Sequence, residues 1–197
     1  MQAAELVNTL YGARGLRLAG GIRGVRDTHR TTLAACDGDQ VIGTLTLGVD
    51  SASGLLADEL YADQLNTMRS SGRRLCEVTA LAVSQERSDT RLLARLFNIA
   101  YLLAHPIHGM TDLVAEVHPR HAGFYRKLMN YRIAGPVRTC PRVRAPAVLM
   151  HLCLQQAKTQ IQRHAGQVNA NERSLYRHFI APHAQHELLC RLRPKSC

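Results

Sequence analysis

The stretch RRLCEVTALAV, Arg73 to Val83, decides the fold. It is an almost uninterrupted apolar run of strand length, which predicts a β-strand covered on both faces at the centre of a sheet. One carboxylate, that of Glu77, lies in the middle of the run. An ionisable group in such a place is costly unless it is ion-paired or has a chemical task. Strand alternation predicts that the side chains sharing a face are those of Leu75, Glu77, Thr79, Leu81 and Val83.

Helices and further strands flank this run on both sides. Downstream, Ser88 or Asp89 can cap an amphipathic helix, and upstream the pair Gly38-Asp39 joins two β-rich segments and predicts a hairpin. We expect helices over 3–11, 55–71, 90–105 and 119–129, and three more helices from residue 155 onward. The expected strands are 31–37, 40–49, 74–83, 111–117, 131–137 with an interruption at Gly135-Pro136, and 147–154. Strands that alternate with helices after an antiparallel hairpin predict an α/β (α+β) fold with a mixed, twisted central sheet.

Composition bounds the class of protein. A chain of 197 residues and 21.8 kDa suits a single domain with a real hydrophobic core. No apolar run reaches transmembrane length and the first residues do not resemble a signal peptide, so we expect a cytoplasmic protein. Six cysteines without CxxC spacing favour reduced, buried thiols over a disulfide framework or a zinc site.

Positive charge is concentrated in the last part of the chain. Residues 1–118 carry 11 Lys/Arg and 13 Asp/Glu, whereas residues 119–197 carry 14 Lys/Arg and 2 Asp/Glu. A surface of net charge +12 attracts polyanions such as nucleic acid, an acidic protein or anionic lipid. The alternative is a protein of high isoelectric point that has no such partner.

Four segments, taken in their order along the chain, carry a resemblance: 41–61 (VIGTLTLGVDSASGLLADELY), 72–83 (GRRLCEVTALAV), 116–135 (EVHPRHAGFYRKLMNYRIAG) and 174–180 (SLYRHFI). They resemble the GNAT acyltransferase superfamily, and within it the FeeM-like N-acyl amino acid synthases, relatives of the acyl-homoserine-lactone synthases. The resemblance implies a GNAT core over residues 1–154 and a basic helical extension over 155–197 packed on it. It also implies transfer of a long-chain fatty acyl group to the α-amine of an amino acid.

The turn after the central strand departs from the ordinary acetyltransferase pattern. Acetyltransferases have a glycine-rich turn here, so that backbone N–H groups can approach the coenzyme A pyrophosphate. Residues 85–91, QERSDTR, contain no glycine, and they include Glu86 and Asp89. The resemblance therefore implies acyl carrier protein as the donor, with its single pantetheine phosphate, and acyl-CoA as a second possibility. The acidic carrier also matches the basic part of the chain.

The resemblance assigns roles to residues near the thioester. Glu77 would be the general base that deprotonates the acceptor amine, and Tyr125 would protonate the leaving thiolate; the alternatives are a buried ion pair with Arg73, Arg74 or an N-terminal arginine, and a core tyrosine. His118 could relay a proton or be a structural histidine at a strand end. A bulge near Val78–Leu81 would supply an oxyanion N–H. The expected substrate-binding residues are Thr79, Leu81, Val83, His121 and Phe124.

Basic residues are the candidates for the donor's phosphate and for the carrier. Pantetheine contacts are expected from Arg87, Ser88 and Arg91, and carrier contacts from Arg120, Arg138, Arg142 and Arg144, against the alternative of a solvated surface. His118 and His121 form an H-x-x-H pair without further ligands at suitable spacing, so we expect no metal and no permanently bound cofactor.

Three other functions remain open on the sequence. An acetyl-CoA-dependent acetyltransferase would share the fold. A nucleic-acid-binding protein would explain the basic charge, although aromatic residues make up 5% and no known binding motif occurs. A catalytically inactive protein that only docks acyl carrier protein would also fit, and a peripheral membrane contact is compatible with all of them.

Overall fold

The structure is a computed structural model that describes residues 29–84, 89–167 and 173–192. Its strands are β1 (Arg30–Asp37), β2 (Gln40–Val49), β3 (Leu75–Val83), β4 (Asp112–Val117), β5 (Arg132–Ile133), β6 (Arg138–Cys140) and β7 (Ala145–Cys153). The α-helices are α2 (Asp58–Ser70), α3 (Thr90–Leu102), α4 (Ala122–Met129), α5 (Leu154–His164) and α6 (Gln185–Leu192). Short helical turns cover Leu103–Ile107, Pro119–His121, Leu175–His178 and Pro182–Ala184.

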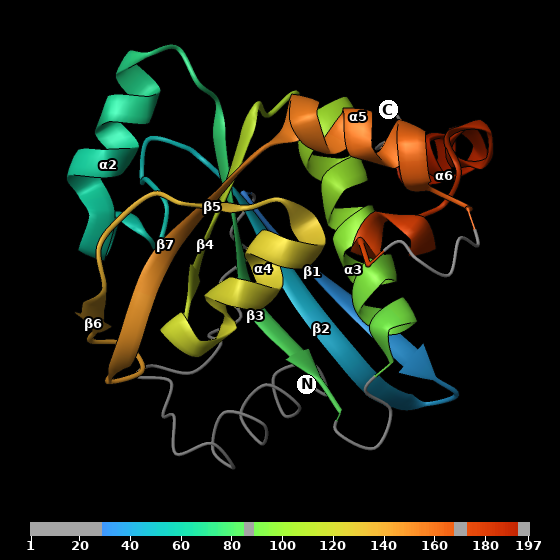
Figure 1. Cartoon of the computed structure of the whole chain (residues 1–197), viewed down its shortest axis with the longest axis horizontal. Helices are drawn as coiled ribbons and strands as arrows, with labels where there is room; N and C mark the ends of the chain where they lie inside the picture. The colour runs from blue at the N-terminus through green and yellow to red at the C-terminus, as the bar shows by residue number, and fades with distance from the viewer. Residues whose placement is uncertain (1–28, 85–88, 168–172, 193–197) are drawn as a thin grey trace.

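A seven-stranded mixed sheet forms the centre of the molecule (Figure 1). The strand order is β1-β2-β3-β4-β7-β5, with β6 paired to the start of β7, and the pair β3–β4 is parallel while the other pairs are antiparallel. β3 is therefore a central strand, as the apolar run predicted. Among the described residues, no helix is long and apolar enough to cross a membrane.

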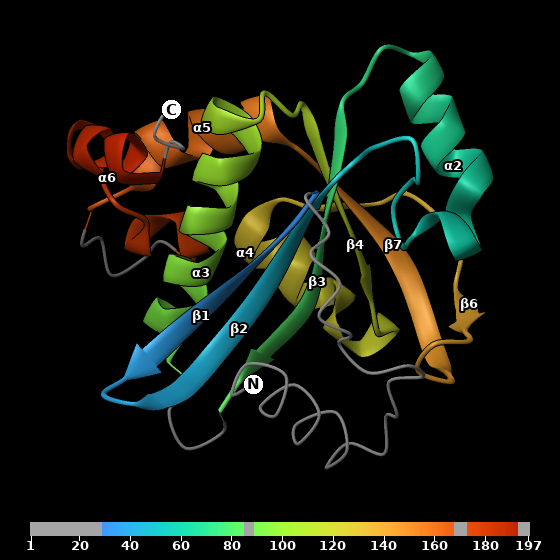
Figure 2. The ribbon, with the colours of Figure 1, turned by 180° about the vertical axis from the view of Figure 1, so that it is seen from behind.

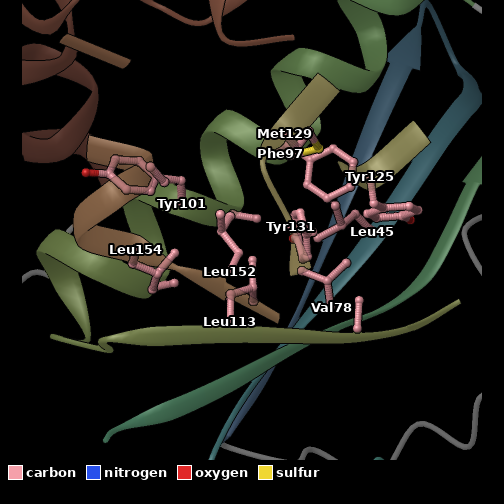
Figure 3. Close-up of a cluster of buried hydrophobic side chains, with 14 of the residues drawn as sticks. Leu45, Val78, Phe97, Tyr101, Leu113, Tyr125, Met129, Tyr131, Leu152 and Leu154 are labelled. Carbon is pink, nitrogen blue, oxygen red and sulfur yellow. The ribbon is translucent and has the colours of Figure 1, made fainter. Parts of the chain in front are cut away.

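The two faces of the sheet are covered differently. One face packs against α3, α4 and α5, and its buried cluster joins residues such as Val78, Phe97, Tyr125 and Leu152 (Figure 3). On the other face α2 packs over β3, β4 and β7, as the view from behind shows (Figure 2), through a smaller cluster of Leu55, Ala57, Tyr61, Leu65, Leu75, Val114 and Leu149.

Most predicted elements are present, and local signals set their ends. The hairpin turns at Gly38, whose φ is 57°. Asp89 caps α3 by accepting a hydrogen bond from the Arg91 N–H at 3.0 Å. α4 ends at Asn130, which is left-handed with φ 59°. The sequence offered Ser88 or Asp89 as the cap of α3, and in the structure Asp89 is the cap.

One interrupted strand was confirmed and one predicted element was wrong. The strand over 131–137 was expected to be interrupted at Gly135-Pro136, and only Arg132–Ile133 pairs with β7 before the chain resumes at β6. Gly135 lies against Tyr61, where a Cβ atom would come within 2.8 Å of the ring, so a regular strand does not fit there. The second helix expected in the tail is a short 3-10 turn at Leu175–His178, after which the Ile180 N–H bonds to the buried side chain of Asn98. The helix expected over 3–11 lies outside the described residues.

The tail lies against the helices of the core. The Tyr176 hydroxyl donates to the carbonyl oxygen of Met129 at 3.0 Å, and the Ile180 N–H donates to Asn98 Oδ1 at 3.0 Å. Leu175, Tyr176 and Phe179 belong to the main buried cluster. The tail therefore contributes to the same hydrophobic core as α3 and α4.

Candidate active site

β3 and β4 form a parallel pair that opens along its length. They pair only from Leu75–Glu77 to Asp112–Val114. Beyond these residues β3 continues to Val83 beside β2, and β4 continues to Val117 beside β7, but β3 and β4 no longer pair with each other. Figure 1 shows the two strands close together at one end and apart at the other. The separated ends leave backbone N–H and C=O groups with no partner on the neighbouring strand. Such groups can bind an extended ligand that lies between the strands.

A β-bulge lies on β3 where the strands separate. Thr44 of β2 pairs with Ala82 and Thr46 pairs with Thr79, so β3 contains one extra residue between these pairs. Ala80 has φ 50°, in the left-handed region, and its carbonyl oxygen accepts a hydrogen bond from the Thr44 hydroxyl at 3.0 Å. A bulge turns backbone groups out of the ladder. The bulge that the resemblance implied is therefore present.

The bulge changes which side chains share a face. Thr79 still lies on the face of Glu77, because Arg30 bonds to both side chains. Leu81 and Val83 instead pack against the cluster on the α3 side. The predicted alternation was therefore wrong beyond Thr79, since the extra residue reverses the direction of the following side chains.

Glu77 is buried, with 1% of its surface exposed, and its carboxylate is fully engaged. Its Oε1 accepts from Arg30 Nη1 at 3.0 Å and from the Leu56 N–H at 2.9 Å, and its Oε2 accepts from the Ala57 N–H at 3.1 Å. The two N–H groups come from the residues that lead into α2. These contacts join β1, β3 and α2.

A second carboxylate, that of Glu116, lies on the same face, on β4. Val114 is in register with Glu77 and packs against α2, so Glu116, two residues further on, faces the same side at the point where β3 and β4 have parted. Its Oε2 is paired with Arg142, which also pairs with Glu59 of α2. Its Oε1 is buried and has no hydrogen-bond partner among the described residues.

The environment of Glu116 favours the protonated form. Burial raises the pKa of Glu116 to about 7, with Arg142 lowering it and the negative charges of Glu77 and Glu59 raising it. The sequence reasoning did not single out this residue. Its signal was available, because Glu116 is a single carboxylate inside the apolar segment DLVAEV, as Glu77 is in its own run.

Tyr125 and Phe124 lie on α4, on the opposite face of the sheet. Tyr125 is buried, and its ring makes edge contacts with Phe97 at 6.2 Å and with Tyr131 at 5.3 Å between centroids (Figure 3). Phe124 is half-buried and packs at the rim of the same cluster. This position is compatible with both expectations for Tyr125: that it packs in the core, and that it protonates the leaving thiolate.

His118 and His121 bracket the short helical turn that follows β4. His118 is half-buried and caps the turn, since its Nδ1 accepts a hydrogen bond from the Arg120 N–H at 3.2 Å. His121 is exposed, and its Nε2 accepts from Arg120 Nε at 3.1 Å. No group of three or more metal-binding side chains occurs within residues 29–84, 89–167 and 173–192.

The predicted basic contacts are dispersed. Arg91 is exposed in the first turn of α3, whereas Arg87 and Ser88 lie outside the described residues. Arg138 donates to the Leu60 carbonyl oxygen and stacks over the Tyr61 ring, and Arg142 makes the ion pairs described above. Both guanidinium groups therefore have partners inside the molecule. Arg120 and Arg144 are exposed.

The fold and the parted strands are those of a GNAT-type N-acyltransferase. Among solved structures, the chain is similar to a CoA-dependent acyl-homoserine lactone synthase, BjaI, with a TM-score of 0.61 and 13% identity over 90% of this chain and 89% of the other. A putative N-acetyltransferase from Lactobacillus plantarum gives a TM-score of 0.55 at 17% identity over 78% of this chain and 89% of that one. These two likenesses show the fold.

The family is narrower than the fold. The family model of the N-acyl amino acid synthase FeeM matches residues 2–153, and the chain belongs to this family. The structure of FeeM, an N-acyl amino acid synthase from uncultured soil microbes, aligns with a TM-score of 0.74 and 25% identity over 80% of this chain and 87% of that one. No curated protein sequence matches the chain. The expected family and fold are thereby confirmed, and the protein is an N-acyltransferase.

Proposed function

We propose that this N-acyltransferase moves a long-chain fatty acyl group from acyl carrier protein to the α-amine of an amino acid. The observation that carries the proposal is the opening between β3 and β4, bordered by a bulge at Ala80, in a chain of the FeeM family. An acyl-pantetheine arm is a narrow, extended amide chain, and the unpaired edges of these strands offer hydrogen bonds to it.

The reaction is a direct transfer without an acyl-enzyme. The neutral amine attacks the thioester carbonyl, a C–N bond forms, the C–S bond breaks and the pantetheine thiolate leaves. A backbone N–H of the bulged segment of β3 would stabilise the tetrahedral oxyanion. Tyr125, on α4, would return a proton to the thiolate. Thr79, one of the predicted substrate-binding residues, lies beside Glu77 on the α2 face, where Arg30 bonds to both side chains.

Acyl carrier protein is favoured as the donor by the sequence of the turn and by charge. The turn over 85–91 lacks the glycines that suit a pyrophosphate. A hollow of about 900 Å³ between α4, β5 and α5 is lined by the cations Arg126, Lys127 and Arg132, and its described lining contains no carboxylate. A surface of this kind suits a strongly acidic partner. Arg120 and Arg144 are exposed and are further proposed contacts of the carrier.

The cysteines fit an enzyme of the cytoplasm. The cysteines within the described residues are unpaired, and Cys76 and Cys140 are buried. Free thiols of this kind are usual where the surroundings are reducing.

We also propose that residues 1–154 form the acyltransferase core and that 155–197 form an extension that completes it.

The test compares donors with the same acyl chain. The purified protein is incubated with myristoyl-acyl carrier protein, myristoyl-CoA or acetyl-CoA and an equimolar mixture of the standard amino acids, and N-acyl products are measured by mass spectrometry. We expect N-myristoyl amino acids, formed at least about tenfold faster from the carrier protein because charge steers the encounter. Acetylated products alone would identify an acetyltransferase, and no product from any donor, with folded protein, would count against the proposal.

A further inference from the structure

Two carboxylates lie on the face of the sheet that α2 covers, Glu77 at the last β3–β4 pair and Glu116 two residues beyond it, and their hydrogen bonding differs. Glu77 accepts hydrogen bonds on both oxygens from one guanidinium and two backbone N–H groups. Glu116 has one oxygen paired with Arg142 and the other buried without a partner among the described residues. A buried acceptor without a donor requires an explanation, and a bound ligand that carries a donor is one.

We propose that Glu116, rather than Glu77, accepts the proton of the acceptor's ammonium group. The inference rests on the proposed function, because it concerns the amine that this function acylates. Glu116 lies two residues beyond the last β3–β4 pair, on the face that α2 covers, where the separated strands admit a substrate. Glu77 then has a positioning role: it fixes Arg30 and the start of α2 beside the opening.

The free oxygen of Glu116 matches an amine in its charged form. An ammonium group carries three N–H donors and a positive charge. One N–H can donate a hydrogen bond to Glu116 Oε1. The positive charge helps to balance Glu116 and Glu59, two carboxylates that are paired with the single guanidinium of Arg142. One N–H proton passes to Oε1 and leaves a neutral amine with its lone pair free for attack. After attack, the nitrogen loses its second proton to water as the thiolate departs. Tyr125 protonates the thiolate and regains a proton from water, and Glu116 releases its proton to solvent, so that the amide, the thiol and one free proton result.

The pKa of Glu116 suits this step. Burial raises the pKa of Glu116 to about 7. The charged and titratable groups that face it are Glu77 from β3, Glu59 and Tyr61 from α2, and Arg142 from the loop before β7. A base with a pKa near the working pH is ionised often enough to act and still accepts a proton readily. Both oxygens of Glu77, by contrast, already accept hydrogen bonds within the protein.

The experiment measures kcat/KM for the acceptor against pH, with myristoyl-acyl carrier protein and the amino acid that the wild type acylates fastest. The wild type should lose activity below a midpoint near pH 7. Glu116→Gln should lower kcat/KM by about 10²–10⁴-fold, the range for loss of a general base. Its residual activity should rise with pH up to the amine's own pKa, with no midpoint near 7. Asp63→Asn, an exposed charge removal on α2, is the matched control and should behave as the wild type.

Neighbouring variants should move the midpoint in opposite directions. Glu59→Gln and Glu77→Gln each remove a negative charge that raises the pKa of Glu116, so the midpoint should fall; Arg142→Met removes the charge that lowers it, so the midpoint should rise. A structural role for Glu116 would not produce these shifts. Circular dichroism at each pH verifies that the variants remain folded.

Two outcomes would overturn the inference alone. One is a folded Glu116→Gln enzyme with a near-normal rate and an unchanged midpoint. The other is a Glu77→Gln enzyme that lacks the midpoint while Glu116→Gln retains it. Both presuppose an active wild type, so they differ from failure of the proposed function, in which the wild type itself forms no N-acyl amino acid.

Discussion

Glu77 shows how a buried charge can hold three segments together. Its carboxylate accepts hydrogen bonds from Arg30 and from the N–H groups of Leu56 and Ala57, and the neighbouring strand leaves it little room. A Cβ atom at Gly48 of β2 would lie 3.1 Å from Glu77 Cγ. This absence of a side chain at residue 48 is what allows the carboxylate to reach α2.

Replacing Glu77 with Gln should reduce stability. Glutamine has one acceptor oxygen in place of two, so at least one donor loses its partner, and the charge of Arg30 is no longer balanced at this site. We expect a loss of about 2–4 kcal/mol in the free energy of unfolding, measured by urea denaturation at pH 7. Asp63→Asn should change it by less than about 0.5 kcal/mol. A Glu77→Gln protein as stable as the wild type would contradict the account of these contacts.

Glu77 and Glu116 are each a single carboxylate in an apolar run of the sequence, but only Glu77 was predicted to have a function. Glu77 is conspicuous because its run is long, whereas Glu116 lies in a shorter run whose neighbours along the chain are ordinary. What distinguishes Glu116 is tertiary. Its partner Arg142 follows 26 residues later, and the further carboxylate on Arg142 belongs to α2. No local pattern brings these residues together.

At the level of elements, the bulge of β3 determines the geometry beside the opening. Ala80 has φ 50°, which is unfavourable for a residue with a Cβ, and the Thr44 hydroxyl bonds to its carbonyl oxygen. β-Branched residues tolerate this region even less. The backbone N–H groups near the proposed oxyanion therefore depend on a small side chain at residue 80.

Ala80→Val should accordingly impair both stability and turnover. We expect a loss of about 1–2 kcal/mol in stability and a fall in kcat of at least about tenfold, because the oxyanion N–H moves from its position. Ala80→Gly accommodates the same φ and should retain kcat. Thermal unfolding and single-turnover acyl transfer measure the two effects. If valine at residue 80 left kcat unchanged, the bulge would have no part in stabilising the oxyanion.

The elements differ in how well the sequence predicts them. β3, the hairpin and α3 follow from apolar periodicity, the Gly38 turn and the Asp89 cap, all of which are local. The interruption between β5 and β6 also follows from a local signal, Gly135-Pro136, whereas the contact of Gly135 with Tyr61, 74 positions away, is tertiary. The tail's 3-10 turn depends on its contact with Asn98. Likewise, the change of face after Thr79 follows from a bulge, and the sequence carries no residue pattern that specifies it.

The tail is the second element whose contribution can be measured. Phe179 is 3% exposed and packs edge-on against Tyr176 at 5.1 Å, within the main buried cluster. Phe179→Ala should reduce the free energy of unfolding by about 3–5 kcal/mol, as in other buried positions. Ile133→Ala, at a side chain 55% exposed, is the control and should have little effect. Equal effects of the two substitutions would mean that the tail does not stabilise the core.

On the scale of the whole molecule, positive charge is concentrated in the last part of the chain, which is what the proposed acidic donor would require. The part of the chain after residue 118 carries net +12, and it supplies α4, β5 and α5, which line the basic hollow. A uniform excess of charge would attract a polyanion without orienting it. A concentration on one part of the surface can also direct the carrier's pantetheine toward the opening between β3 and β4.

Salt should therefore weaken the reaction with acyl carrier protein selectively. Between about 0.01 M and 1 M salt the Debye length falls from about 30 Å to about 3 Å, so kcat/KM for myristoyl-acyl carrier protein should fall by at least about tenfold. The kcat/KM for myristoyl pantetheine, which is uncharged, should change little.

Arg126→Glu, within the hollow, should lower kcat/KM for the carrier at low salt more than Arg95→Glu, an equal charge reversal at an exposed residue of α3. If the two reversals acted equally, only the net charge would matter; if salt affected both donors alike, the basic surface would have no role in recognising the carrier.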